Sequence, residues 1–241
     1  MGHTSSPTGH GSTPPRRRVA LVGSAPLARD MSLLIDSCDI VIRCNEAKTL
    51  GGHAGSRTDV LCVTNTGSPA QRIIAEQSIR RSPRFPGLSE VWFPRESHVH
   101  LRALEASGFQ ISSSEFEDRS QDILTANGLG DDIAVTYFSA DFNERIFASL
   151  KQKSADPFVC PSTGFMALCH LLERDDYETF DKLILGFTFQ MWEGHPARAE
   201  QRFIRALCSR RPDLHWIPCR PRRWSIDWMN RFRRFRPRQP A

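Results

Sequence analysis

The stretch "RVALVGSAP", Arg18 to Pro26, decides the fold of this chain. Its first five residues form a short, mainly apolar run, which is typical of a strand buried in a sheet. Gly23 gives the backbone freedom for a tight turn, and Pro26 suits the first turn of a helix. We expect that helix to run to about Ile35. A buried strand that leads into a helix is the building unit of α/β proteins.

The same alternation continues along the chain. Further short apolar runs predict strands over residues 39–45, 59–64, 90–93, 182–187 and 214–217. Helical patterns lie between them, over residues 69–80, 100–107, 120–126, 142–151, 165–172 and 197–208. This order predicts an α/β fold with a mostly parallel sheet flanked by helices. We assign residues 18–219 to this domain, 1–17 to a disordered tail and 220–241 to a basic, aromatic tail.

Composition is that of an ordinary globular protein, with 39% hydrophobic and 24% charged residues in 241. No apolar run approaches the roughly 20 residues that span a bilayer, and no apolar segment marks a secretory signal. The seven cysteines include no Cys-x-x-Cys pair, and several lie in apolar runs. We therefore predict buried free thiols, no zinc site and a cytoplasmic location.

Positive charge is concentrated in the tails. The formal net charge of the whole chain is +5. Residues 220–241 hold eight arginines and one acidic residue, whereas residues 19–219 carry a net charge of −5. The body therefore offers no general face for nucleic acid, and we expect no nucleic-acid partner.

The C-terminal tail has aromatic residues at helical spacing. They are Trp224, Trp228, Phe232 and Phe235. A helix with this stripe beside arginines fits an anionic membrane surface, which predicts a peripheral location at the inner face of a membrane through residues 220–238. A helix docked on the core and an RNA-binding tail are the alternatives.

The stretch "CPSTGFMALCHLL", Cys160 to Leu172, places small residues directly ahead of an apolar helix. Ser162 or Thr163 can cap that helix by accepting a hydrogen bond from its first N–H groups. The same N–H groups, next to Gly164, can bind an anion. One set of groups serves both interpretations, so the stretch alone does not choose between them.

Ligands in parallel sheets bind beyond the carboxyl ends of the strands. Gly23 and Ser24 follow the first predicted strand, Asn45 ends the second, and Gly186 ends a later one. The turn after the first strand is neither Gly-x-Gly-x-x-Gly nor a Walker loop. A nicotinamide or ATP site therefore lacks its main support.

Three segments resemble the motifs of one enzyme family. "VALVGSAP" followed by "IDSCDIVIRCNEAKTLGGHAGSRTDV" resembles the large sialyl motif of the sialyltransferases of glycosyltransferase family 29. "PSTGFMALCHLLERDDYETFDKLILGF" resembles the small motif, and "HPARAE" resembles the very small motif, His-x4-Glu. The three occur in the family's order and cover roughly 80 residues, which makes the resemblance more specific than any single motif.

The resemblance implies a Rossmann-like glycosyltransferase architecture of the GT-A variant type, a reaction and a site. The donor would be a CMP-sugar of the sialic acid or Kdo type, and a hydroxyl of a glycan or lipid-linked glycan would displace CMP with inversion. His195 would be the general base, because its pKa near neutrality suits this role, and Glu200 would orient the loop. The nucleotide would lie against Gly23, Ser24, Asn45, Ser162, Thr163 and Gly164. No Asp-x-Asp occurs in the chain and the leaving group is a monophosphate, so we predict neither metal nor cofactor.

Each of these residues also has a structural interpretation. His195 could cap the following helix, and Glu200 could be a solvated helix charge. Asn45 could close a turn, and Gly23 with Ser24 could form a plain strand–helix turn.

Several positions depart from the family pattern. Ser24 stands where the family has Asn, and Arg18 stands where it has the first cysteine of a disulfide. No cysteine lies between residues 175 and 186, where the partner would be, and residues 189–192 do not match the family's aromatic motif. A noncatalytic nucleotide- or glycan-binding relative is therefore the alternative function, and an unrelated Rossmann-type enzyme such as a methyltransferase is a more distant one.

Overall fold

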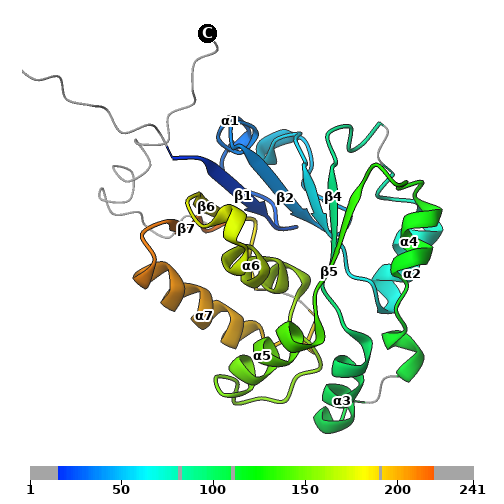
Figure 1. The fold of residues 1–241 in the computed structure, drawn as a ribbon. Coiled ribbons are helices and arrows are strands. Elements are labelled where there is room, and N and C mark those ends of the chain that lie inside the picture. Colours follow the sequence, from blue (N-terminus) through cyan, green and yellow to red (C-terminus); the bar gives the residue numbers. More distant parts are fainter. Residues whose placement is uncertain (1–15, 81–82, 110–111, 190–191, 220–241) are drawn as a thin grey trace, which may run out of the picture.

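A single parallel sheet organises the computed structural model, which describes residues 16–80, 83–109, 112–189 and 192–219 (Figure 1). Within this part of the chain, seven strands lie side by side in the order β5-β4-β3-β2-β1-β6-β7. Every neighbouring pair is parallel. The strands are β1 Arg18–Val22, β2 Ile40–Cys44, β3 Val60–Cys62, β4 Glu90–Phe93, β5 Ala134–Tyr137, β6 Asp181–Leu185 and β7 Leu214–Trp216.

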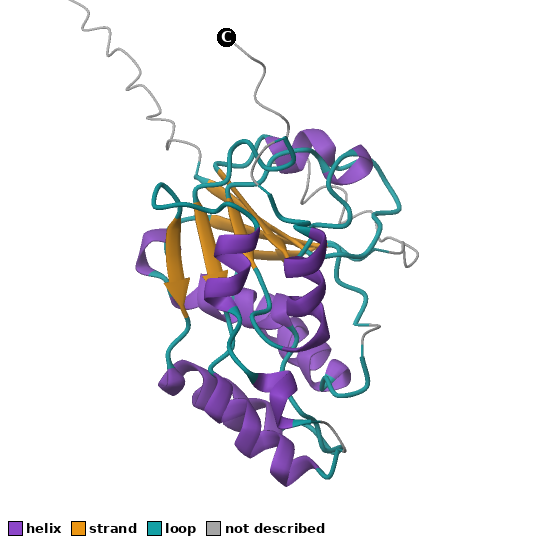
Figure 2. Cartoon of the chain, turned by 90° about the vertical axis from the view of Figure 1, so that its right-hand side faces the viewer, coloured by secondary structure: helices purple, strands orange, loops and turns teal. Residues whose placement is uncertain are grey.

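Helices cover both faces of this sheet (Figures 1 and 2). The α-helices are α1 Ser32–Asp36, α2 Gly67–Glu76, α3 Ser97–Ser107, α4 Ser120–Ala126, α5 Ala140–Lys151, α6 Thr163–Glu173 and α7 Ala197–Arg210. Three 3₁₀ turns, Gly52–Ala54, Ser113–Phe116 and Asp175–Tyr177, complete the described elements. The predicted α/β class with a parallel sheet flanked by helices is confirmed.

Side chains of β1 show how the two layers form. Val19 and Leu21 point to one face and share a core with apolar residues of α5, α6 and α7. Ala20 and Val22 point to the other face and pack with Ile35 of α1. Both faces of the sheet are shielded from water, because successive side chains of a strand point alternately into the two layers of helices. An apolar run without polar alternation was therefore the correct signal for β1.

The predicted helix from Pro26 to about Ile35 is wrong in its first part, because only Ser32–Asp36 is helical. Residues of the segment use their backbone groups elsewhere. Ala25 N–H donates to the carbonyl of Gly186 (3.1 Å), and Met31 N–H donates to that of His53 (2.9 Å). These bonds hold the segment against neighbouring loops in place of a helical ladder. Gly23 and Ser24 are therefore not followed by a helix N-terminus.

Strand β5 was not predicted. It lies at the sheet edge and is mostly exposed, with Tyr137 at 55%. An exposed edge strand lacks the continuous apolar run that marked the others. The remaining predicted strands and helices are confirmed, with ends that differ by a few residues.

All seven cysteines are free, and every one except Cys208 is buried. Arg18, at the position of the family's first cysteine, donates its backbone N–H to Asp39 (2.8 Å) and its guanidinium to the Ser37 carbonyl (3.2 Å). Within the described residues no helix combines the length and apolarity needed to cross a bilayer. The predicted tails, 1–17 and 220–241, lie outside the described residues except for Arg16 and Arg17.

Candidate functional site

The strand order reverses between β1 and β6, and the loops that follow these strands meet there. Such a switch point is where ligands bind in open α/β sheets. Gly23 N–H donates to the Leu185 carbonyl at 2.8 Å. A Cβ at Gly23 would lie 2.4 Å from the carbonyl oxygen of Gly186, so only glycine permits this approach. Gly23 thus joins the ends of β1 and β6.

Phe187 connects this switch point to α6. A Cβ at Gly164 would lie 2.6 Å from the Phe187 ring, and a Cβ at Gly23 would lie 3.2 Å from the same ring. The ring therefore packs between two glycines that are far apart in sequence. Thr163 is buried at the start of α6, whereas Ser24 is exposed and no described residue bonds its hydroxyl.

Ser162 caps α6, as the capping interpretation predicts. Its Oγ accepts from Phe165 N–H (3.2 Å). Ser162 also donates from N–H and Oγ to the two carboxylate oxygens of Glu200, each at 2.7 Å. Glu200 is fully buried in the first turn of α7, so the interpretation as a solvated charge is wrong. Burial raises the pKa of Glu200, and the bonds from Ser162 partly offset this effect.

His195 lies just ahead of α7, beside the same segment. Its Nδ1 is 2.7 Å from the Cys160 carbonyl oxygen. Because a carbonyl only accepts, Nδ1 carries the proton and Nε2 keeps its lone pair. Nε2 bonds no described residue, and no side chain caps α7, so the interpretation of His195 as a helix cap is wrong. Burial and the charge of Arg95 lower the pKa of His195, which favours the neutral imidazole.

Asn45 closes β2 and also keeps a free donor. Its φ of 51° is left-handed, and its N–H donates to the Cys62 carbonyl (2.9 Å). Its Oδ1 accepts from Thr64 N–H (2.8 Å). The side-chain NH₂ has no hydrogen-bond partner among the described residues and remains available for a ligand acceptor.

A chain of contacts links Asn45 to His195. Thr64, which bonds Asn45, accepts from Arg95 Nε at 3.0 Å. Arg95 Nη1 contacts the Cys160 thiol, and the Cys160 carbonyl bonds His195. The structure therefore brings Asn45 and His195 into one cluster with Ser162 and Glu200. Sequence reasoning missed Thr64, Arg95 and Cys160, although Arg95 has a usable signal, since it follows β4 at the carboxyl edge.

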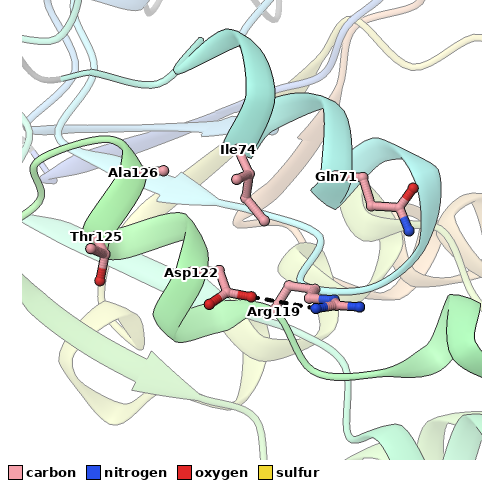
Figure 3. A pocket seen from close by; sticks show the side chains of 6 residues that line it. All are labelled: Gln71, Ile74, Arg119, Asp122, Thr125 and Ala126. Carbon is pink, nitrogen blue, oxygen red and sulfur yellow. Dashed lines mark ion pairs between the residues drawn. The ribbon is translucent and has the colours of Figure 1, made fainter.

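The surface of the described residues has several hollows. One of about 210 Å³ is bordered by residues 154–157, Glu193, His195 and the start of α7. A larger one of about 520 Å³ lies between α2 and α4, where Arg119 faces Asp122 at 3.6 Å (Figure 3). The larger hollow includes no motif residue. Among the described residues no three His, Cys, Asp or Glu side chains are grouped as metal ligands.

Comparison with known proteins assigns the family. A model of glycosyltransferase family 29 (sialyltransferase) matches residues 7–174. The chain belongs to glycosyltransferase family 29. It is also 26% identical over 195 residues to the urease operon 23 kDa accessory protein of Rhizobium meliloti (strain 1021), covering 80% of this chain and 89% of that protein.

The family match covers the large motif and the start of the small one. It includes Gly23, Asn45 and Ser162, and it ends before His195 and Glu200. This family 29 protein nevertheless places both late residues against the small motif, through Ser162–Glu200 and Cys160–His195 contacts. Family 29 enzymes generally use a CMP-sugar donor and a glycan acceptor.

Proposed function

We propose that this family 29 protein transfers a sugar of the sialic acid or Kdo type from its CMP conjugate to a glycan hydroxyl, with inversion. The observation that carries the proposal is the state of His195. Its Nδ1–H is held by the Cys160 carbonyl at 2.7 Å, and its Nε2 bonds none of the described residues. A neutral imidazole in this tautomer is ready to accept a proton.

The nucleotide would occupy the cluster between the switch point and α6. Thr163 and Gly164 are the first residues of α6, and their N–H groups have no partner within the helix. Such groups favour an anion, here the CMP phosphate. The side-chain NH₂ of Asn45, which bonds no described residue, adds a donor at the carboxyl end of β2. Ser162 and Glu200 position this helix start through the two hydrogen bonds between them.

The transfer itself needs one base and one stabilised leaving group. The acceptor oxygen forms a bond to the anomeric carbon while its proton passes to Nε2 of His195. The bond from that carbon to the phosphate oxygen breaks, and CMP leaves with the electron pair. Charge builds on the phosphate, so donors already aimed at it lower the barrier. The hollow beside His195 is our proposed acceptor entrance.

A noncatalytic CMP- or glycan-binding role is the second candidate. It is favoured by Ser24, which is exposed and supplies a hydroxyl where the family has an amide. In this role the nucleotide would bind as described, but no turnover would follow.

The first test is calorimetric titration of the purified protein with CMP, UMP, GDP and NAD, without added metal. We expect selective binding of CMP. Absence of CMP binding would overturn the donor assignment.

The second test separates the enzyme from a binding protein. His195→Asn keeps a side-chain donor for the Cys160 carbonyl but has no titratable base. We expect the variant to bind CMP as the wild type does and to lose turnover with CMP-sugars by at least 100-fold, the usual contribution of a general base. His98→Asn, at an exposed histidine on α3, is the control and should keep full turnover. Equal turnover in His195→Asn would exclude His195 as the base.

A further inference from the structure

Arg95 is a half-buried arginine whose backbone is fixed by a dedicated side chain. Asn65, fully buried after β3, accepts from Arg95 N–H at 3.1 Å and donates to the Arg95 carbonyl at 2.9 Å. The same amide donates to Asp118 at 2.9 Å. The oxygen and the nitrogen of the buried Asn65 amide therefore both hold the backbone of Arg95 in place. This is the arrangement expected at a preorganised site.

Within the part of the chain that the structure describes, the guanidinium of Arg95 has spare donors and no carboxylate partner. Its Nε donates to Thr64 Oγ1 at 3.0 Å and its Nη1 contacts the Cys160 thiol. Its Nη2 bonds no described residue, and no described carboxylate lies within ion-pair distance. By contrast, Arg57 and Arg174 each contact a carboxylate, at 3.1 and 2.8 Å. A half-buried cation that is paired with no described carboxylate is stabilised by a ligand that supplies an anion.

Arg95 lies in the same cluster as Asn45 and His195. Thr64 joins it to Asn45, and Cys160 joins it to His195. Burial raises the pKa of the Cys160 thiol, but the charge of Arg95 and the imidazole of His100 hold that pKa below its usual value. The positive field of Arg95 therefore reaches the groups beside the proposed base.

We propose that Arg95 binds an anionic oxygen group of the donor, either the phosphate of the nucleotide or the carboxylate of a 2-ulosonic acid sugar. The inference rests on the proposed function, because it takes the donor from there. A guanidinium presents parallel N–H donors that match either group. At the phosphate, its charge would also stabilise the leaving group as the glycosidic bond breaks.

The experiment titrates wild type and Arg95→Gln with cytidine, CMP, CMP-sialic acid and inorganic phosphate. If the phosphate is the partner, Arg95→Gln weakens CMP binding by about 10- to 100-fold, the usual effect of losing a charged hydrogen bond, and leaves cytidine unchanged. If the carboxylate is the partner, CMP is unchanged and only CMP-sialic acid binds more weakly. Arg145→Gln, at an exposed arginine paired with Glu173, is the control and changes none of these affinities.

A second measurement uses the wild-type protein, so the folding of the variant does not decide the result. Phenylglyoxal modification of Arg95, followed by peptide mass spectrometry, is expected to slow in the presence of CMP or CMP-sialic acid but not cytidine. Equal affinities in Arg95→Gln, or no protection by any anionic ligand, would overturn the inference. If inorganic phosphate binds through Arg95 while CMP does not bind better than phosphate, Arg95 binds an anionic oxygen group that does not belong to a CMP donor, and the proposed function fails. If the wild type binds neither phosphate nor any CMP ligand, both fail.

Discussion

Two neighbours set the tautomer and the protonation of His195, and they act on it in different ways. The Cys160 carbonyl fixes the proton on Nδ1, and the charge of Arg95, added to burial, disfavours a second proton. An imidazole in this setting stays neutral under conditions where an exposed one is partly protonated. A general base must be unprotonated to act, so the surroundings extend its working range toward acid pH.

This balance predicts a direction for the titration of His195. In the folded wild type the pKa of His195 lies below its usual value of 6.5. Removing the nearby positive charge in Arg95→Gln stabilises the imidazolium, so the pKa of His195 rises relative to wild type. A pH titration of the His195 ring signals by NMR measures both values, and it does not depend on turnover. An unchanged pKa in Arg95→Gln would show that the charge of Arg95 does not reach the ring.

At the scale of elements, the contact between β1 and β6 depends on one glycine. Gly23→Ala would place a Cβ 2.4 Å from a backbone oxygen, which cannot rotate away. We expect a loss of at least about 2 kcal/mol in the free energy of unfolding, the usual scale for overpacking. Urea denaturation measures this loss. Gly130→Ala is the matched control, because its nearest atom is 3.8 Å from the added Cβ and its loop is exposed. A Gly23→Ala protein as stable as Gly130→Ala would contradict the close approach.

The sequence predicted the elements that are buried in the apolar core. It did not predict the elements whose conformation depends on tertiary contacts. The apolar run at β1 and the capped, apolar α6 carry their structure in local sequence. The short helix α1 is different, because Pro26 favours a helix start while tertiary bonds at Ala25 and Met31 hold the chain in bends ahead of it. Propensity is a weak guide where such contacts compete.

The residues of the candidate site also divide into those with a local sequence signal and those that only tertiary contacts bring to the site. Motif spacing indicated Gly23, Asn45 and Ser162, because small residues at strand ends and helix starts are locally recognisable. The contact of Cys160 and Arg95, 65 residues apart, exists only once the sheet has formed. No periodicity in the sequence encodes such a pair, and only the ends of the predicted strands hint that Arg95 is near.

At the scale of the whole molecule, the site is assembled from both halves of the chain. Gly23 and Asn45 come from the first two strands, whereas Ser162 and His195 come from the last third of the described sequence. The β1–β6 pairing brings them together. A ligand that contacts both halves therefore binds the folded sheet and not the unfolded chain, and it stabilises the whole domain in proportion to its affinity.

The charge of the whole molecule is divided between an acidic body and a basic C-terminal tail. Residues 220–241 hold eight arginines, and aromatic residues lie among them. Basic residues near an anionic membrane contribute about 1 kcal/mol each, and aromatic residues favour the interface. We therefore expect the full chain to bind vesicles that contain anionic lipid, and binding to weaken as salt is raised. Phosphatidylcholine vesicles are the control and should bind far less.

Deleting residues 220–241 tests this division directly, because the described fold ends at Cys219. We expect the truncated protein to keep its melting temperature and its affinity for CMP, since none of the cluster residues is removed. Vesicle co-sedimentation should fall to the level seen with neutral lipid, because the remaining body is net negative and anionic lipid repels it. Unchanged sedimentation would assign membrane binding to the body, and a lower affinity for CMP would place the tail at the nucleotide site instead of the membrane.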